Sequence, residues 1–339
     1  MDLERLKDTA QAMVSPGKGI LAMDESAPTC QKRFDALGIP STQEMRREYR
    51  TMLVTTAGLG EHIGGAILFD ETLRDETLDG RSFVEILNEQ GIVPGIKVDT
   101  GAKDLALRPG EKVTEGLDGL DRRLAEYREI GALFAKWRAV YVIGGNCPSS
   151  ACYVANAHGL ARYAALCQAN DIVPIVEPEV LMDGSHSIDE SFIVTQQAQQ
   201  LVFEALASQG VNLEGIVLKP SMVISGSGGS DRAGIDEVAI QTLRCLRSTV
   251  PPAVPGIAFL SGGQSDEEAT LHLNAINNLE SNLPWAVTFS YGRALQAAAM
   301  KKWGGDSRNF GEAQKVVYHR ARMNGLASLG KYQPGLEAI

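Results

Sequence analysis

The sequence has too few suitably placed cysteines and histidines for a disulfide framework or a metal site. Its five cysteines are odd in number and scattered, and none forms a Cys-x-x-Cys pair. Disulfide scaffolds and zinc knuckles both need paired or closely spaced cysteines. The five histidines are also scattered, without the helical spacing of metal ligands. We therefore expect reduced cysteines, a cytoplasmic location, and no metal.

Excess positive charge and long apolar runs are missing as well. The chain of 339 residues has 32 Lys and Arg against 42 Asp and Glu, a net charge of −10. This balance argues against bulk electrostatic binding to nucleic acid or to an anionic membrane. No apolar run approaches the length of a membrane span, and the first residues lack the apolar region of a signal peptide. We expect partners that are neither nucleic acid nor membrane, and an anionic substrate would need a local cluster of cations.

The chain does contain a repeated alternation of apolar strand patterns with amphipathic helix patterns. We count about eight such units, the first strand at 19–23 and the last at 285–289, and units of this kind feed one parallel sheet. No dinucleotide-type glycine fingerprint follows the first strand, so a single closed (β/α)8 TIM barrel is favoured over an open doubly wound sheet. We expect a barrel catalytic domain over 1–330, with an extra N-terminal helix over 3–14, and an irregular C-terminal tail over 331–339.

Charged residues occur at or near the C-terminal ends of strands that should be apolar on both faces. Residues two apart on a strand point the same way, so these charges should face the barrel axis, at the end where barrel active sites lie. Each one alone could be a solvated strand end or part of a structural ion pair. Burying the whole set is costly unless its members pair or serve chemistry. The set is Asp24, Lys97, Asp99, Lys136, Arg138, Glu177, Glu179 and Lys219.

Lys219 is the candidate nucleophile of this set. It ends an apolar strand and precedes Pro220, so desolvation should lower the pKa of its ammonium, and a nearby Lys136 would lower it further. A neutral lysine can attack a carbonyl and form an imine. Glu177 could then be a general acid, and Asp24 an acid/base on a substrate hydroxyl. The alternative is a lysine that reaches water or binds phosphate as a point charge.

Two groups of residues are suited to binding phosphate. The ends of the last two strands combine glycine N–H groups, a serine hydroxyl and an arginine that opens a helix, at a place where barrels often bind phosphate. These residues are Ser261, Gly262, Gly292 and Arg293. A second, smaller basic group lies just past the first strand, for which a solvated helix start is an equal alternative. Its members are Ser26, Lys32 and Arg33.

Taken in order, these motifs resemble the class I (Schiff-base) fructose-1,6-bisphosphate aldolases. The first-strand region, with Thr29-Cys30 before Lys32-Arg33, looks closest to the plant plastid branch. The matching stretches extend over most of the chain, as far as Tyr332. They are GKGILAMDES from residue 17, GIKVD from 95, FAKWR from 134, PIVEPE from 174, LEGIVLKPSMV from 213, FLSGGQS from 259 and FSYGRALQ from 289.

The resemblance implies a carbon–carbon lyase that reversibly cleaves fructose 1,6-bisphosphate to dihydroxyacetone phosphate and glyceraldehyde 3-phosphate through a lysine imine. Such an enzyme serves glycolysis, gluconeogenesis or Calvin-type carbon metabolism. It needs no metal or other cofactor, because the protonated imine is itself the electron sink. The family also implies phosphorylated sugar substrates and a homotetramer. Two alternatives stay open: an imine-forming aldolase for another ketose phosphate, and a non-catalytic barrel scaffold.

The resemblance also implies residue roles. Lys219 would form the imine, Glu177 would help expel water from the carbinolamine, and Asp24 would act on the hydroxyl whose deprotonation breaks the carbon–carbon bond. The remaining catalytic positions would be Lys136, Glu179 and Arg138. The substrate-binding positions would be Lys97, Ser26, Lys32, Arg33, Ser261, Gly262, Gly292 and Arg293.

The chain departs from the family pattern in two places. Many members end in a tyrosine on a mobile tail, linked to proton transfer in turnover, whereas the last tyrosine here, Tyr332, lies near the start of the tail and the sequence ends at Ile339. In addition, the segment 27–29 replaces the commoner small polar residues beside the predicted far-phosphate site. This second departure bears on the preference for a bisphosphate over a monophosphate.

Overall fold

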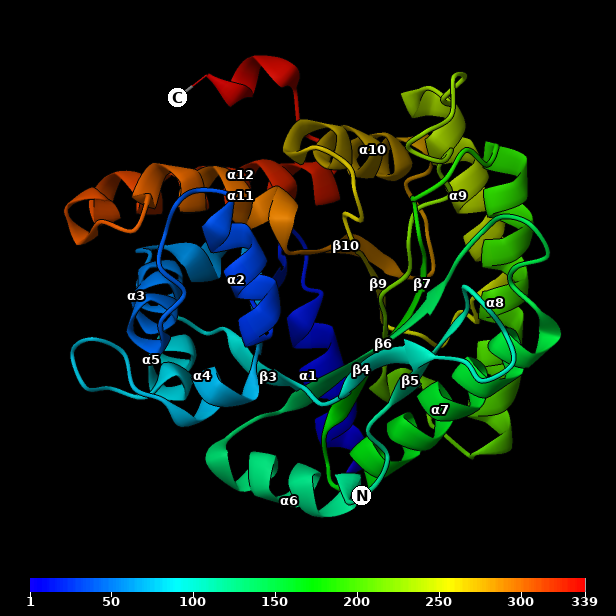
Figure 1. The fold of residues 1–339 in the computed structure, drawn as a ribbon, viewed down its shortest axis with the longest axis horizontal. Coiled ribbons are helices and arrows are strands. Elements are labelled where there is room, and N and C mark those ends of the chain that lie inside the picture. The colour runs from blue at the N-terminus through cyan, green and yellow to red at the C-terminus, as the bar shows by residue number, and fades with distance from the viewer. Residues whose placement is uncertain (339) are drawn as a thin grey trace.

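The structure is a computed structural model that describes residues 1–338. Eight parallel strands close into a barrel in the order β1–β10–β9–β8–β7–β6–β3–β2, with helices around it (Figure 1). The predicted (β/α)8 barrel is therefore confirmed. The barrel strands are β1 Gly19–Ala22, β2 Ile63–Leu68, β3 Val93–Lys97, β6 Phe134–Tyr141, β7 Val173–Val180, β8 Val217–Leu218, β9 Gly256–Phe259 and β10 Ala286–Tyr291.

The helices alternate with these strands, and several of them begin at a side-chain cap. Ser82, Ser187 and Ser265 each form a capping box with a glutamate three residues later, which satisfies free N–H groups of the first turn. Among residues 1–338, no helix is both long and apolar enough to cross a membrane. The α-helices are α1 Leu3–Met13, α2 Ala27–Asp35, α3 Gln43–Val54, α4 Asp70–Arg74, α5 Phe83–Glu89, α6 Leu120–Ile130, α7 Ser150–Ala169, α8 Ile188–Ser208, α9 Ile235–Thr249, α10 Asp266–Leu279, α11 Arg293–Trp303 and α12 Phe310–Ser328.

Helix α1 is the predicted extra N-terminal helix, and it packs against the barrel (Figure 1). Its apolar side chains Leu6, Ala10 and Met13 are buried in one cluster with side chains from inside the barrel, among them Phe134 and Ile175. The α1–β1 connection leads directly to the start of the first strand, so α1 covers the amino-terminal end of the barrel. The site must therefore open at the other end.

Several short elements were not predicted. Strands β4 (Gly101–Asp104) and β5 (Lys112–Glu115) form an antiparallel hairpin between β3 and α6. Helices α2 and α4 occupy segments for which no helix was predicted. The predicted C-terminal tail carries a short 3-10 helix at Pro334–Glu337. It is tied to α12 because the carboxylate of Glu337 accepts a hydrogen bond from Arg320, and within the tail the hydroxyl of Tyr332 donates to the same carboxylate.

Close packing at the amino-terminal end of the barrel makes Gly95 a sensitive position. A Cβ added at Gly95 would overlap the aromatic ring of Phe134, which is fully buried. We expect Gly95→Ala to lower the free energy of unfolding by about 3 kcal/mol, because an overpacked core must displace side chains or backbone. Urea unfolding followed by circular dichroism measures this. The control is Gly159→Ala in α7, where nothing lies within 4 Å of the added Cβ. Equal stability of the two variants would contradict the expectation.

Candidate active site

A cavity of about 770 Å³ opens at the carboxyl-terminal ends of the barrel strands. Every residue predicted for the catalytic or substrate-binding site lines it, including both groups of residues predicted to bind phosphate. The side chains come from β1, β3, β6, β7, β8, β9 and β10 or the segments that follow them. Predicted site residues as far apart in the chain as Asp24 and Arg293 thus share one cavity. Their individual roles stay predictions.

The centre of this cavity is a chain of alternating charges. The carboxylate of Glu177 lies between two lysines, with Oε1 3.2 Å from Lys219 Nζ and Oε2 3.4 Å from Lys136 Nζ. Lys136 Nζ is also 2.7 Å from Asp24 Oδ2. Lys219 and Lys136 are each 4% exposed, and Glu177 is 3% exposed. Buried charges are stable only when paired in this way, so each side chain fixes the place of the next.

The backbone explains why Lys219 stands beside Glu177. Strand β8 is only two residues long, and Leu218 lies opposite Val176 of β7. The N–H of Lys219 continues this pairing, because it donates a 2.8 Å hydrogen bond to the carbonyl of Val176. Pro220 then ends the strand, since it has no N–H to donate. The Lys219 side chain is thereby placed next to Glu177, the residue that follows Val176 on β7.

The charges around Asp24 keep it ionised. Burial by itself would raise the pKa of Asp24, but the positive charges of Lys136 and Lys219 outweigh it and lower the pKa to about 2. Burial would likewise lower the pKa of Lys136, but the carboxylates of Asp24 and Glu177 raise it above its ordinary value. Near neutral pH, Asp24 is therefore a carboxylate that can accept a proton, and Lys136 is an ammonium.

Other charged side chains complete the wall of the cavity. The guanidinium of Arg138 pairs with the carboxylate of Glu179 on the neighbouring strand, and this carboxylate helps raise the pKa of Arg138 against the opposing effect of burial. Lys97 Nζ donates to the side chain of Asp99 at 2.6 Å and to its backbone carbonyl at 2.8 Å. Both pairs leave cationic groups at the cavity, where a polyhydroxylated anion would meet them.

The two groups of residues predicted to bind phosphate lie on different loops. Ser261 and Gly262 follow β9, and Gly262 turns the chain with a left-handed φ of +55°, which glycine adopts without strain. Arg293 opens α11 and donates to the carbonyl of Gly262. In the second group, Arg33 of α2 is paired with the buried carboxylate of Glu25. Backbone N–H groups, a hydroxyl and a guanidinium are the donors that phosphate sites use.

Some residues of the cavity were not among the predicted site residues. Two of them follow β1 and the third lies on β10, and only their closeness in sequence to Asp24, Ser26 and Gly292 could have indicated them. The hydroxyl of Ser290, for example, is buried without a hydrogen-bond partner within the described part of the chain. The additional polar residues of the lining are Glu25, Thr29 and Ser290.

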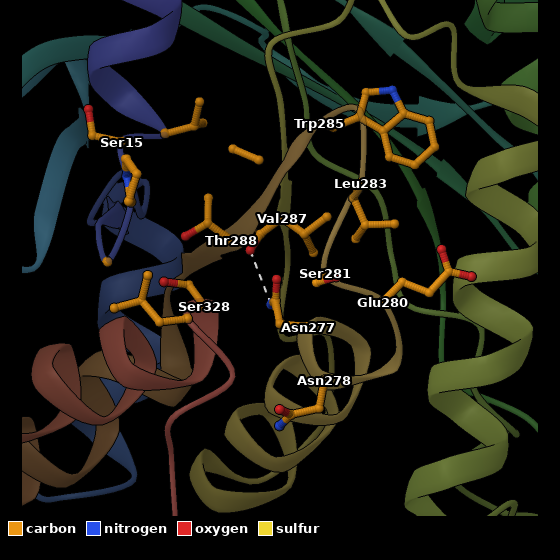
Figure 2. Close-up of a pocket in the computed structure, with 15 residues that line it drawn as sticks. Ser15, Asn277, Asn278, Glu280, Ser281, Leu283, Trp285, Val287, Thr288 and Ser328 are labelled. Atoms are coloured by element: carbon orange, nitrogen blue, oxygen red, sulfur yellow. Dashed lines mark hydrogen bonds between the residues drawn. The ribbon is translucent and has the colours of Figure 1, made fainter.

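A second cavity, of about 490 Å³, lies near the starts of β1 and β10 (Figure 2). Among its lining residues, Glu280 carries the one charged side chain. The amide of Asn277 is already used, because it donates to the carbonyl of Val287. This cavity has no cationic group for a phosphate and no nucleophile paired with an acid, so it does not compete as the catalytic centre. Nor do any three His, Cys, Asp or Glu side chains within 1–338 converge as metal ligands would.

Comparisons with known proteins agree with the geometry. Residues 5–338 match the family model described as fructose-bisphosphate aldolase class-I. The chain is 57% identical to a protein of Xanthomonas campestris pv. campestris named "Probable fructose-bisphosphate aldolase class 1", covering 98% of this chain and all of the relative. It is 54% identical to "Fructose-bisphosphate aldolase 2, chloroplastic" of Pisum sativum, covering 97% of this chain and 93% of the relative. The predicted resemblance, which includes plant plastid members, is confirmed.

A solved structure shows the same fold. The fructose-bisphosphate aldolase of Plasmodium falciparum, determined in complex with TRAP and a small-molecule inhibitor, superposes with a TM-score of 0.96. The two chains are 50% identical, and the match covers 98% of this chain and 96% of the other. Sequence, fold and cavity therefore point to one conclusion: this chain belongs to the class I fructose-bisphosphate aldolase family.

Proposed function

We propose that this protein reversibly cleaves fructose 1,6-bisphosphate to dihydroxyacetone phosphate and glyceraldehyde 3-phosphate through an imine on Lys219. The observation that carries the proposal is the buried sequence of charges Lys219–Glu177–Lys136–Asp24. It places an amine, a proton carrier, a cation and a carboxylate within one cavity. These are the groups that imine formation and retro-aldol cleavage require.

The first chemical stage is formation of the imine. Glu177 takes a proton from the ammonium of Lys219, 3.2 Å away, and the free amine adds to the C2 carbonyl of the open-chain ketose. A proton passes from the attacking nitrogen to the former carbonyl oxygen, and Glu177 then returns its own proton to the resulting hydroxyl, which leaves as water. A protonated imine between Lys219 and C2 remains.

The second stage is cleavage. Asp24, held as a carboxylate, accepts the proton of the C4 hydroxyl as the bond between C3 and C4 breaks. The electron pair of that bond moves into the protonated imine and forms an enamine, and the aldehyde product leaves. Protonation at C3 followed by hydrolysis releases dihydroxyacetone phosphate and regenerates Lys219. Because the imine accepts the electron pair, no step calls for a metal or other cofactor.

The two phosphates would be held at the two loop groups described above. Ser261, Gly262, Gly292 and Arg293 would bind the C1 phosphate, and Ser26, Lys32 and Arg33 would bind the C6 phosphate. Lys97, Arg138 and Glu179 would contact the hydroxyl groups between them. The test is a coupled cleavage assay in the presence of EDTA at about 10 mM, which would remove a catalytic divalent ion. Activity on the bisphosphate should be retained. Activity lost with EDTA and restored by a divalent ion would refute the imine proposal.

One observation favours a second candidate, an aldolase for another ketose phosphate. The first turn of α2, beside Ser26, contains Pro28, which has no N–H to offer a phosphate. The C6 phosphate would thus meet one backbone donor fewer. Comparing kcat/KM for fructose 1,6-bisphosphate and fructose 1-phosphate decides between the two candidates. A non-catalytic scaffold has no observation in its favour, since every charged position of the site is filled.

Assembly and location belong to the same proposal. Membership of the family supports a homotetramer, which light scattering after size-exclusion chromatography would measure. A cytoplasmic location is supported by the scattered cysteines and by a relative that is 50% identical and named "Fructose-bisphosphate aldolase 4, cytosolic", from Arabidopsis thaliana. Chloroplastic relatives exist as well, so fractionation of the source cells is the direct test.

Replacing Arg33 should separate the two substrates. We expect Arg33→Gln to raise KM for fructose 1,6-bisphosphate by about 10- to 100-fold, since a charge-assisted hydrogen bond to phosphate is lost while glutamine can still bond to Glu25. KM for fructose 1-phosphate, which has no C6 phosphate, should change less than about two-fold on the same physical ground. Steady-state kinetics with both ketoses provide the measurement. An equal rise in KM for both substrates would show that Arg33 does not bind the C6 phosphate.

A further inference from the structure

A buried pair of side chains lies behind the loop that follows β9. Gln264 closes the segment Ser261-Gly262-Gly263, and His272 lies two turns along α10. The side chains of Gln264 and His272 are joined by a 2.6 Å hydrogen bond between Oε1 of the amide and Nδ1 of the ring. Gln264 is 6% exposed and His272 is 3% exposed. Neither belongs to the lining of the catalytic cavity, so their role must be exerted through the loop.

The amide of Gln264 connects this pair to Ser261. Its Nε2 donates to the carbonyl of Ser261 at 3.1 Å, and its backbone N–H donates to the same carbonyl at 3.0 Å. Nε2 also lies 3.9 Å from the sulfur of Met222, in the segment that follows Lys219. The carbonyl of Ser261 is therefore held on the α10 side of the loop by two donors of one residue. Ser261 itself lines the catalytic cavity.

The directions of these hydrogen bonds follow from the network. If the Gln264 amide were turned over, its oxygen would face the carbonyl oxygen of Ser261, and two acceptors would repel each other. Oε1 must therefore face His272, which requires the proton of the neutral imidazole to be on Nδ1. Burial lowers the pKa of His272 to about 4, so the ring is neutral near pH 7. His272 thus determines which way the Gln264 amide points.

We propose that His272, acting through Gln264, is a positioning residue for the loop that binds the C1 phosphate. The proposal rests on the proposed function, because it assigns Ser261 and Gly262 to that phosphate. Without the Nδ1 donor, Oε1 of Gln264 is left buried and unpaired, and the amide can relieve this only by rotating away from Ser261. The loop then loses one of the two bonds that hold the Ser261 carbonyl, and the hydroxyl is no longer fixed for the phosphate.

Two substitutions of His272 test the proposal. His272→Leu removes the donor, and we expect KM to rise about five-fold for fructose 1,6-bisphosphate and for fructose 1-phosphate alike, which is the factor that one hydrogen bond provides. Both ketoses carry the C1 phosphate. His272→Asn places an amide N–H₂ where Nδ1 stood, so KM should stay close to that of the wild type. In both variants kcat should change little, because Lys219, Glu177 and Asp24 are untouched.

A matched control separates positioning from mere stability. Thr270 is fully buried on the same helix and bonds to Asn324 at 2.7 Å, away from the loop. Thr270→Val should lower the melting temperature and leave KM unchanged. Gln264→Met keeps the length of the side chain but cannot bond to Ser261, and it should raise KM as His272→Leu does. If His272→Leu fails to fold, the KM of Gln264→Met tests the proposal in its place.

The outcomes are distinct. Raised KM in His272→Leu and Gln264→Met, with wild-type KM in His272→Asn and Thr270→Val, would support the proposal. Unchanged KM in His272→Leu, or an equal rise in His272→Leu and His272→Asn, would overturn it. The concentration of dihydroxyacetone phosphate that gives half-maximal borohydride trapping offers a second readout and should shift in parallel, since this ligand carries only the C1 phosphate. A wild-type protein that cleaves neither ketose would instead refute the proposed function itself.

Discussion

Replacing Lys219 by methionine should abolish cleavage of fructose 1,6-bisphosphate, with a loss in kcat of at least about 10⁴-fold, because the nucleophile of the covalent pathway is gone. Methionine has nearly the length of lysine and can fill the space of this buried side chain. Glu177 would keep Lys136 as its partner. The variant should therefore fold, so its inactivity can be attributed to the missing amine.

Borohydride trapping measures this directly. The wild-type protein, incubated with dihydroxyacetone phosphate and borohydride in EDTA, should carry a reduced adduct on Lys219 that peptide mass spectrometry locates. Lys219→Met should carry none. Lys301→Met, at an exposed position on α11, is the control and should be labelled like the wild type. An adduct on another lysine, or cleavage that survives in Lys219→Met, would mean that Lys219 only binds phosphate or supports the structure.

The barrel was predictable from the sequence because its units are long and regular. Helix α8, for example, has signals that can be read directly from the sequence, because a serine cap and an acidic first turn precede a long apolar periodicity. The hairpin β4–β5 was missed for the opposite reason. Strand β4 is only four residues long and mostly exposed, so it has no apolar pattern. Its partner β5 is held by packing on α7, where Asn156 donates to the carbonyl of Lys112.

The membership of the cavity was also predictable, but its internal pairing was not. Alternation along a strand places Lys136 and Arg138 on one face, and Trp137 on the other, where it stacks on Tyr163 of α7. The contact between Lys136 on β6 and Asp24 after β1 joins strands that are not neighbours in the sheet. Closure of the barrel creates it, and no local pattern specifies it. Whether the pKa of Asp24 is raised or lowered depends on this contact, since burial alone would raise it.

The second large effect is expected for Glu177. We expect Glu177→Gln to lower kcat by about 10³-fold, within the range that one acid–base group contributes, with a much smaller change in KM. Glutamine has the same shape, and its carbonyl can still accept a hydrogen bond from Lys219. What it loses is the ability to take a proton from the ammonium of Lys219 and return one to the departing hydroxyl. Imine formation, measured as the rate of borohydride trapping with dihydroxyacetone phosphate, should slow in the same proportion as kcat.

Glu179→Gln is the matched control, because Glu179 is a similarly buried carboxylate on the same strand that pairs with Arg138 and not with Lys219. We expect it to slow trapping far less than Glu177→Gln does. A larger loss of trapping rate in Glu179→Gln than in Glu177→Gln would mean that a residue other than Glu177 carries the proton. A Glu177→Gln variant with raised KM and normal kcat would mean the same.

Asp24 is poorly suited to replace Glu177 as that proton donor. Burial would raise the pKa of Asp24, but the charges of Lys136 and Lys219 lower it to about 2, so Asp24 is ionised near pH 7 and has no proton to give. Asp24 can accept the C4 proton as a carboxylate, but it cannot supply the proton that expels water. In the proposed mechanism the two carboxylates would therefore have different tasks, because Lys136 and Lys219 hold Asp24 ionised, whereas within residues 1–338 it is Glu177 that pairs with Lys219.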